Sequence, residues 1–353
     1  MRTSLIVCAA LSVLFLTAPP AGAAGIGAVP VVTGLDFPAA FTLAPDGRVF
    51  YTNTYTGQIR IYDPSNGSDT LFFTLTGNTG VQGILGLLLA PTYPTQPYLF
   101  AHVTRTVQSV LVDQLVRIRD DGGVGTQPKV IYQASAGSDH HGGRMLFGSD
   151  GLLYLVTGDE ADPAHSQDLA SPLGKMLRMT ANGKVPPGNP FGTLVWAYGL
   201  RNSFGWDFDP QTGSIWEEDN GPECNDEINA IQKGKNYGWG PSETCTTPPP
   251  PPRNTNQDGP RPVLPIEYFA TPTAPTGVAF CDGCGLTGAE GHLFYGTFNT
   301  LNIHEVVLTT DRRHIASDTI AYTHSSIILS IEQGPDGNLY FSDDTTIYEL
   351  IQT

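Results

Sequence analysis

The chain has 353 residues, of which 40 are glycine and 29 are proline, while only 15% are charged. Its formal net charge is −16, with 18 lysines and arginines in total. This balance argues against a basic groove for nucleic acid or a basic face for an anionic membrane surface. The 40% of hydrophobic residues argue against a disordered chain. Abundant glycine and proline with few charges favour an all-β protein rich in turns.

The N-terminal residues predict export. Arg2 supplies a positive charge, an apolar run follows from Leu5 to Leu16, and the small residues 21–23 are typical of a cleavage site. We expect residues 1–23 to be a signal peptide and the mature protein to be periplasmic or extracellular. A membrane anchor is the alternative, but the apolar run is shorter than the ~20 residues that a spanning helix needs.

One pattern recurs six times along the rest of the chain: an apolar strand, a turn, and a second apolar or aromatic strand. The copies lie at 41–51, 86–100, 145–154, 206–216, 277–295 and 331–341. Each copy is typical of a hairpin, which cannot bury its own faces. Closing such units into a ring leaves few sheet edges exposed. The pattern therefore predicts an all-β fold, a six-bladed β-propeller over residues 24–353, with the first and last strands in one sheet.

Proline and cysteine add detail to this prediction. Five consecutive prolines at 248–252 cannot join a sheet ladder, so we expect a proline-rich loop on the rim near 242–262. Four cysteines remain after the predicted signal peptide, and an even number in an exported chain indicates disulfides. Proximity favours the pairs Cys224–Cys245 and Cys281–Cys284. A zinc site is the alternative, although the chain contains a single C-x-x-C.

Three polar stretches could carry chemistry. Residues 139–144 include two histidines, and histidine is the natural general base near neutral pH. Arg201 and Asn202 are expected to end a strand and could bind an anionic ligand or pin a turn. Residues 218–227 hold five carboxylates around Gly221-Pro222, which suits calcium; a solvated acidic loop is the alternative.

Five blocks of sequence resemble the glucose/sorbosone dehydrogenase family. They are GILGLLLAP at 83–91, GGRMLFGSDGLLYLVTGD at 142–159, DLASPLGKMLRMTANGKVPPGNPF at 168–191, VWAYGLRNSFGWDFDPQTG at 195–213 and NGPECNDEINAIQKGKNYGWG at 220–240. The resemblance implies a propeller that binds pyrroloquinoline quinone (PQQ) and calcium at its central opening. It also implies oxidation of an aldose at the anomeric carbon, with an external electron acceptor.

The same resemblance implies roles for single residues. His140, four residues before the Arg of the H-x-x-G-R block, would be the base that takes the proton of the anomeric hydroxyl. Asp139 and Gln82 would contact the sugar, Arg201 and Asn202 the cofactor, and the carbonyls of Gly221 and Pro222 the calcium ion that polarises the quinone. We expect His140, rather than His141, to point into the central opening, because adjacent side chains of an extended strand face opposite ways.

The chain departs from the family where the cofactor would be held. PQQ is a tricarboxylate, and the family supplies a lysine from the fifth blade and two arginines from the last. Here residues 296–304 contain no lysine, and Ile327 and Leu329 stand in place of the arginines. Without these cations, the set of charged groups that would hold PQQ is incomplete. Each charge-assisted bond contributes about 1.5–3 kcal/mol, so the loss weakens cofactor binding. The alternatives are a non-redox propeller that binds carbohydrate or protein, similar to hedgehog-interacting relatives, and a calcium-dependent hydrolase of the lactonase kind.

Overall fold

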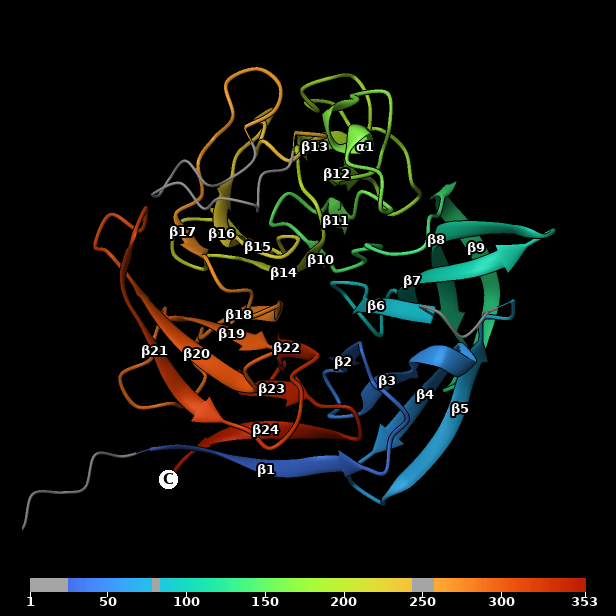
Figure 1. The fold of residues 1–353 in the computed structure, drawn as a ribbon. Helices are drawn as coiled ribbons and strands as arrows, with labels where there is room; N and C mark the ends of the chain where they lie inside the picture. Colours follow the sequence, from blue (N-terminus) through green and yellow to red (C-terminus); the bar gives the residue numbers. More distant parts are fainter. Residues whose placement is uncertain (1–24, 78–82, 243–256) are drawn as a thin grey trace, which may run out of the picture.

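The computed structural model describes residues 25–77, 83–242 and 257–353. Within these ranges, 24 strands form six four-stranded antiparallel sheets, which stand around a central axis (Figure 1). The six-bladed β-propeller predicted from the repeats is confirmed. The predicted signal peptide, Gln82, Cys245 and most of the proline-rich loop lie outside the described residues.

Each blade runs from an inner strand beside the axis to an outer strand at the periphery (Figure 1). In this order, blade 1 comprises β2 (Phe41–Leu43), β3 (Val49–Asn53), β4 (Gln58–Asp63) and β5 (Ser68–Thr74); blade 2 β6 (Gly83–Leu89), β7 (Tyr98–Val107), β8 (Val110–Asp120) and β9 (Gly125–Ser135); and blade 3 β10 (Met145–Phe147), β11 (Leu153–Thr157), β12 (Lys175–Met179) and β13 (Val195–Tyr198). Blade 4 comprises β14 (Ser203–Phe208), β15 (Ile215–Asp219), β16 (Asp226–Ile231) and β17 (Glu267–Phe269); blade 5 β18 (Pro275–Phe280), β19 (Leu293–Thr297), β20 (Asn302–Leu308) and β21 (Ile315–Thr323); and blade 6 β22 (Ser330–Gln333), β23 (Leu339–Ser342), β24 (Thr346–Gln352) and β1 (Ile26–Thr33). The short helices η1 (Thr54–Thr56) and α1 (Ala164–Gln167) lie in loops.

Blade 6 closes the ring by combining strands from both ends of the described chain. β1 pairs antiparallel with β24, from Ile26 opposite Gln352 to Thr33 opposite Thr346. The predicted sharing of one sheet by the first and last strands is therefore confirmed. Closure leaves each blade packed against two neighbours.

Separate hydrophobic clusters fill the six blade interfaces. Between blades 1 and 2, Phe50 and Ile59 pack with Leu99 and Val103. Equivalent clusters lie at the other five interfaces. Alternating apolar residues on each strand create these faces, because successive side chains of a strand point to opposite sides of its sheet.

The candidate site residues gather on one face of the ring, here called the upper face. In each blade, this face carries the loop between the second and third strands and the loop that leads to the next inner strand. His140 precedes β10, Arg201 lies between β13 and β14, and Gly221 lies between β15 and β16. The propeller topology thus places residues that are distant in sequence on a common face.

Cys281 and Cys284 form the predicted disulfide in the loop between β18 and β19, which removes them as zinc ligands. Cys224 is also disulfide-bonded, and Cys245, its expected partner, lies outside the described residues. Across the described part of the chain, no helix has the length and apolar character needed to cross a membrane.

Candidate active site

His140 pairs with a carboxylate that the sequence analysis did not single out. Its Nδ1 atom lies 2.7 Å from Oδ1 of Asp159. The Asp159 side chain is 1% exposed, whereas that of His140 is 21% exposed. The Trp239 indole N–H donates to Oδ2 of Asp159 at 2.7 Å, and the N–H of Ala161 donates to Oδ1 at 2.9 Å. A carboxylate held at both oxygens can orient the imidazole and stabilise its protonated form, as a general base requires.

A close approach of two loops creates this pair. Gly158 lies so near to His140 that a Cβ atom there would overlap the His140 carbonyl oxygen. His140 itself has a φ of +62°, a left-handed conformation that is uncommon for residues other than glycine. The position of Asp159, two residues after the end of β11, was the available signal, because loops after strands often carry functional side chains.

His141 faces the interface between blades 2 and 3. Its Nδ1 atom lies 2.8 Å from Oε2 of Glu160 and 3.4 Å from Oδ1 of Asp113. Burial lowers the pKa of His141, but hydrogen bonds to these two carboxylates outweigh burial and raise the pKa to about 9. The side chains of His140 and His141 face different surroundings, as expected. The expectation assumed an extended strand at this position, and that assumption was wrong. The left-handed turn at His140, not an extended strand, separates them.

Arg201 lies directly beside the His140–Asp159 pair. Its carbonyl accepts a hydrogen bond from the N–H of Asp159 at 2.8 Å, and its guanidinium carbon lies 5.3 Å from the centroid of the Trp239 ring. The Arg201 Nη1 atom donates to the carbonyl of Gly221 at 2.8 Å. The structure therefore brings together three of the residues singled out from sequence: His140, Arg201 and Gly221.

The other residues singled out from the sequence do not all contact the His140–Asp159 pair. The N–H of Asn202 donates to Oδ1 of Asp219 at 2.7 Å, so its backbone pins a turn while its side chain lines a cavity. Asp139 is exposed and Pro222 is half-buried. The carboxylate that contacts His140 is Asp159, not the adjacent Asp139.

Much of the acidic stretch is buried. Glu218 on β15 is 1% exposed, and Asp226 and Glu227 at the start of β16 are 1% and 7% exposed. Burial raises the pKa of Glu218 well above its usual range, and neither of its carboxylate oxygens has a hydrogen-bond partner. A solvated acidic loop does not describe these carboxylates, since carboxylates withdrawn from water cost free energy unless protons or a cation offset their charge.

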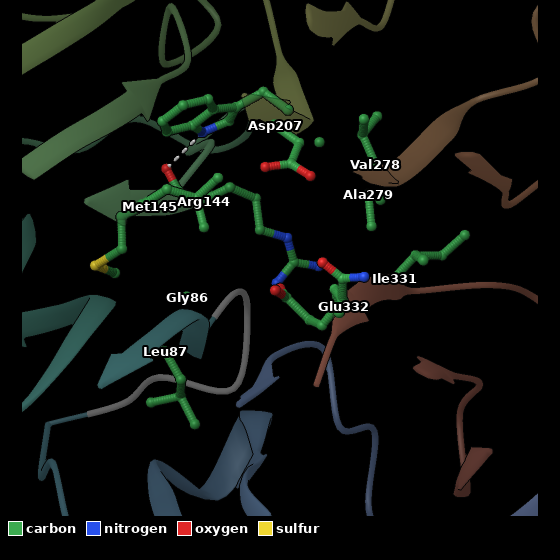
Figure 2. Close-up of a pocket in the computed structure, with 14 residues that line it drawn as sticks. Gly86, Leu87, Arg144, Met145, Asp207, Val278, Ala279, Ile331 and Glu332 are labelled. Carbon is green, nitrogen blue, oxygen red and sulfur yellow. Dashed lines mark hydrogen bonds between the residues drawn. The ribbon is translucent and has the colours of Figure 1, made fainter. Parts of the chain in front are cut away.

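Arg144 occupies the axis of the ring. Its guanidinium donates to the carbonyls of Leu85, Phe204 and Leu329 at 3.0, 3.1 and 2.7 Å, which connects blades 2, 4 and 6. A pocket on the lower side of Arg144 is lined by inner strands of the ring. Figure 2 shows the guanidinium facing the Glu332 carboxylate in this pocket.

A second cavity lies on the upper side of Arg144. Aromatic, aliphatic and amide side chains line it: Phe37, Ala39, Tyr55, Leu85, Asn202, Phe204, Asn220, Ala274, Thr276, Phe298 and Leu329. No lysine or arginine is among these lining residues, and Leu329 occupies the wall where the resemblance implied an arginine. His140 lines neither axial pocket, so its orientation toward the central opening stays a prediction.

Known proteins share this architecture along nearly the whole chain. The family model described as Glucose / Sorbosone dehydrogenase matches residues 35–352. The aldose sugar dehydrogenase YliI of Escherichia coli is 26% identical over 339 residues, which cover 90% of this chain and 90% of that protein. An oxidoreductase (glucose dehydrogenase) of Thermus thermophilus has a TM-score of 0.81 at 29% identity, over 93% of this chain and 100% of that one. The PQQ-bound aldose sugar dehydrogenase of Streptomyces coelicolor has a TM-score of 0.78 at 26% identity, over 95% of this chain and 100% of that one. The chain therefore belongs to the glucose/sorbosone dehydrogenase family.

Proposed function

We propose that this protein is an exported aldose dehydrogenase in which His140 removes the proton of the sugar's anomeric hydroxyl. The observation that carries the proposal is the 2.7 Å contact between His140 and the buried carboxylate of Asp159. Membership of the family and the common face shared with Arg201 support it. The proposed location, periplasmic or extracellular, depends on residues 1–23 acting as a signal peptide.

The proton step can be derived from residues of this chain. Asp159 contacts Nδ1 of His140, which leaves Nε2 as the atom that accepts a proton from a hydroxyl. The charge that then develops on the imidazole is stabilised by the Asp159 carboxylate, which Trp239 holds in place. Such base catalysis typically contributes 10²–10⁴-fold to a rate. The proposed sugar contacts are Asp139, which is exposed, and Gln82.

The upper cavity does not fit PQQ as the family's clamp would hold it. Three carboxylates need cations or several charge-assisted donors, but the lining residues named above carry no positive charge. Their polar side chains are the hydroxyls of Tyr55 and Thr276 and the amides of Asn202 and Asn220, and the Asn220 amide already donates to two backbone carbonyls. The two guanidinium groups beside this cavity are already engaged: Arg144 donates to the carbonyls of Leu85, Phe204 and Leu329, and Arg201 donates to those of Asn220 and Gly221. We therefore assign no reaction step to PQQ, and propose that any quinone-class acceptor binds without the full set of carboxylate contacts.

The carbonyls of Gly221 and Pro222 are also poorly placed to hold a calcium ion. The Gly221 carbonyl accepts a hydrogen bond from the positively charged Arg201 at 2.8 Å, and a guanidinium in that position repels a cation. The buried carboxylates of β15 and β16 offer harder oxygen ligands close by. We propose that calcium, if it binds this region, is held by those carboxylates.

A dye-reduction assay tests the proposed activity. The purified protein is given a panel of aldoses with an electron-accepting dye and one of three additions: PQQ with Ca²⁺, a neutral quinone, or buffer. Aldose-dependent reduction that His140→Ala abolishes supports the proposal. If no aldose gives reduction with any addition, the dehydrogenase hypothesis is wrong.

A non-redox binding propeller is the second candidate, and the apolar lining of the upper cavity favours it. Phe37, Tyr55 and Phe298 provide aromatic surface of the kind on which a sugar ring or an apolar side chain can pack. A glycan array with the wild type and Phe298→Ala separates this function from oxidation. Glycan binding without dye reduction would establish it.

A further inference from the structure

The residues that follow His140 and Asp159 along the chain meet each other inside the protein. His141 follows His140, Glu160 follows Asp159, and Nδ1 of His141 lies 2.8 Å from Oε2 of Glu160. Asp113 on β8 completes the group, because one ligand atom from each of the three residues lies within 4.8 Å of the others. Their exposed fractions are 0% for Asp113, 2% for His141 and 5% for Glu160.

Several polar atoms of this group have no hydrogen-bond partner. They are Oδ2 of Asp113, Nε2 of His141 and Oε1 of Glu160. Two carboxylates that are buried side by side repel each other strongly in a low dielectric, unless a cation or a proton lies between them. Hydrogen bonds from Thr104 to Asp113 at 2.5 Å and from the N–H of Gly137 to Glu160 at 2.7 Å hold the carboxylates in position.

A second imidazole lies against the same group. In the β7–β8 ladder Asp113 is opposite Thr104, and His102, two residues from Thr104, projects from the same face of the sheet. His102 is 0% exposed, and neither of its ring nitrogens has a hydrogen-bond partner. Gly143 leaves the room that this ring needs, since a Cβ there would lie 2.7 Å from Nδ1 of His102.

We propose that Asp113, His141 and Glu160 bind a divalent transition-metal ion between blades 2 and 3, beside the buried ring of His102. One imidazole and two carboxylates suit zinc, manganese or iron, whereas calcium and magnesium prefer oxygen ligands alone. The bound ion would tie β8 of blade 2 to the two loops of blade 3 that carry His140 and Asp159. This site is independent of the proposed dehydrogenase activity.

Metal analysis of the intact protein tests the proposal. The protein is purified without chelator or affinity histidines, and a second sample is unfolded with EDTA and refolded with Zn²⁺ or Co²⁺, because the ligands are buried. We expect about one transition-metal ion per chain, visible d–d absorption from Co²⁺, and a higher melting temperature in the refolded metal-loaded sample. His141→Gln and Glu160→Gln should each reduce the metal content at least tenfold.

A matched control is His324→Gln. His324 is also a buried histidine paired with a carboxylate, Asp343, at 2.9 Å, but within the described part of the chain it contacts a single carboxylate. This variant should keep the full metal content. The proposal is overturned if neither wild-type sample retains metal after dialysis, in which case a shared proton holds the carboxylates together. It is also overturned if His324→Gln loses metal as completely as His141→Gln does.

Discussion

Nδ1 of His140 contacts the buried carboxylate of Asp159 at 2.7 Å, so the other ring nitrogen is the one left to accept a proton. If aldose oxidation is detected, His140→Ala should lower kcat by about 10²–10⁴-fold. Asp159→Asn should lower it by at least roughly tenfold, because an amide stabilises the imidazolium less than a carboxylate does. His141→Gln should affect turnover far less than His140→Ala. Steady-state kinetics of the three variants checks this, and equal losses at both histidines would contradict the assignment.

Leu329→Arg should restore one cation to the upper cavity. Leu329 and Asn202 are both among the residues that line this cavity, so a guanidinium at position 329 could pair with a carboxylate of PQQ. One charge-assisted bond is worth about 1.5–3 kcal/mol, and calorimetry should therefore show PQQ affinity rising about ten- to a hundredfold. Leu329→Gln is the control of similar length without charge. No gain over this control would mean that PQQ does not bind in the upper cavity.

Lys175→Met should destabilise the fold by about 3 kcal/mol. The Nζ atom of Lys175 donates to the carbonyls of His165, Ser166 and Leu173 at 2.6, 3.1 and 2.6 Å. Methionine fills the space but leaves these buried acceptors unpaired, which costs about 1–3 kcal/mol each before relaxation. Chemical denaturation measures the loss. The exposed Lys129→Met should change stability by less than about 0.5 kcal/mol.

Asp207 should make the folded state less stable as the pH rises. Burial in the lower axial pocket raises the pKa of this carboxyl to about 7, although the N–H groups of Phe280 and Phe208 partly oppose the shift. Between about pH 4 and pH 7 the folded state therefore binds more protons than the unfolded state, and stability falls through this window. Asp207→Asn should therefore be more stabilising at pH 8 than at pH 5, by about 2–3 kcal/mol at about 1.36 kcal/mol per pKa unit. Melting curves at both pH values check this, with the exposed Asp121→Asn as control; an equal gain at both would contradict it.

Calcium should stabilise the protein through the buried carboxylates of blade 4. One carboxylate oxygen of Glu217 has no hydrogen-bond partner among the described residues. Burial, together with the nearby carboxylates of Asp219 and Glu227, raises the pKa of Glu217 well above its usual range. Millimolar Ca²⁺ added after EGTA treatment should raise the melting temperature by several degrees, and Glu217→Gln should remove most of that rise. An unchanged melting temperature in wild type would exclude calcium here.

The architecture and the two inner strands of each blade could be predicted from the sequence, whereas the two outer strands of each blade were not singled out. All six repeats coincide with the first two strands of a blade, as the copy at 145–154 does with β10 and β11. Turn chemistry and strand alternation are local properties, so they can be identified in a single chain. The positions of Arg201 and Gly221 on a shared face follow from the same topology.

The contacts between residues of the candidate active site could not be predicted from the sequence. Asp159 lies nineteen residues after His140, and nothing in local pattern indicates that two loops approach closely enough to join them. The left-handed backbone at His140 was also missed, because histidine seldom adopts it. The buried group around His141 combines residues of two blades, and only the packing of those blades brings them together.

The pairing of Ile26 with Gln352 has a consequence for biosynthesis. Five blades are each made from one continuous stretch of chain, so each can form as it leaves the ribosome. Blade 6 cannot, because its outer strand is synthesised first and its other three strands last. The ring therefore stays open until β24 has been synthesised, and a chain truncated within β24 loses the partner of β1 as well as its own strand.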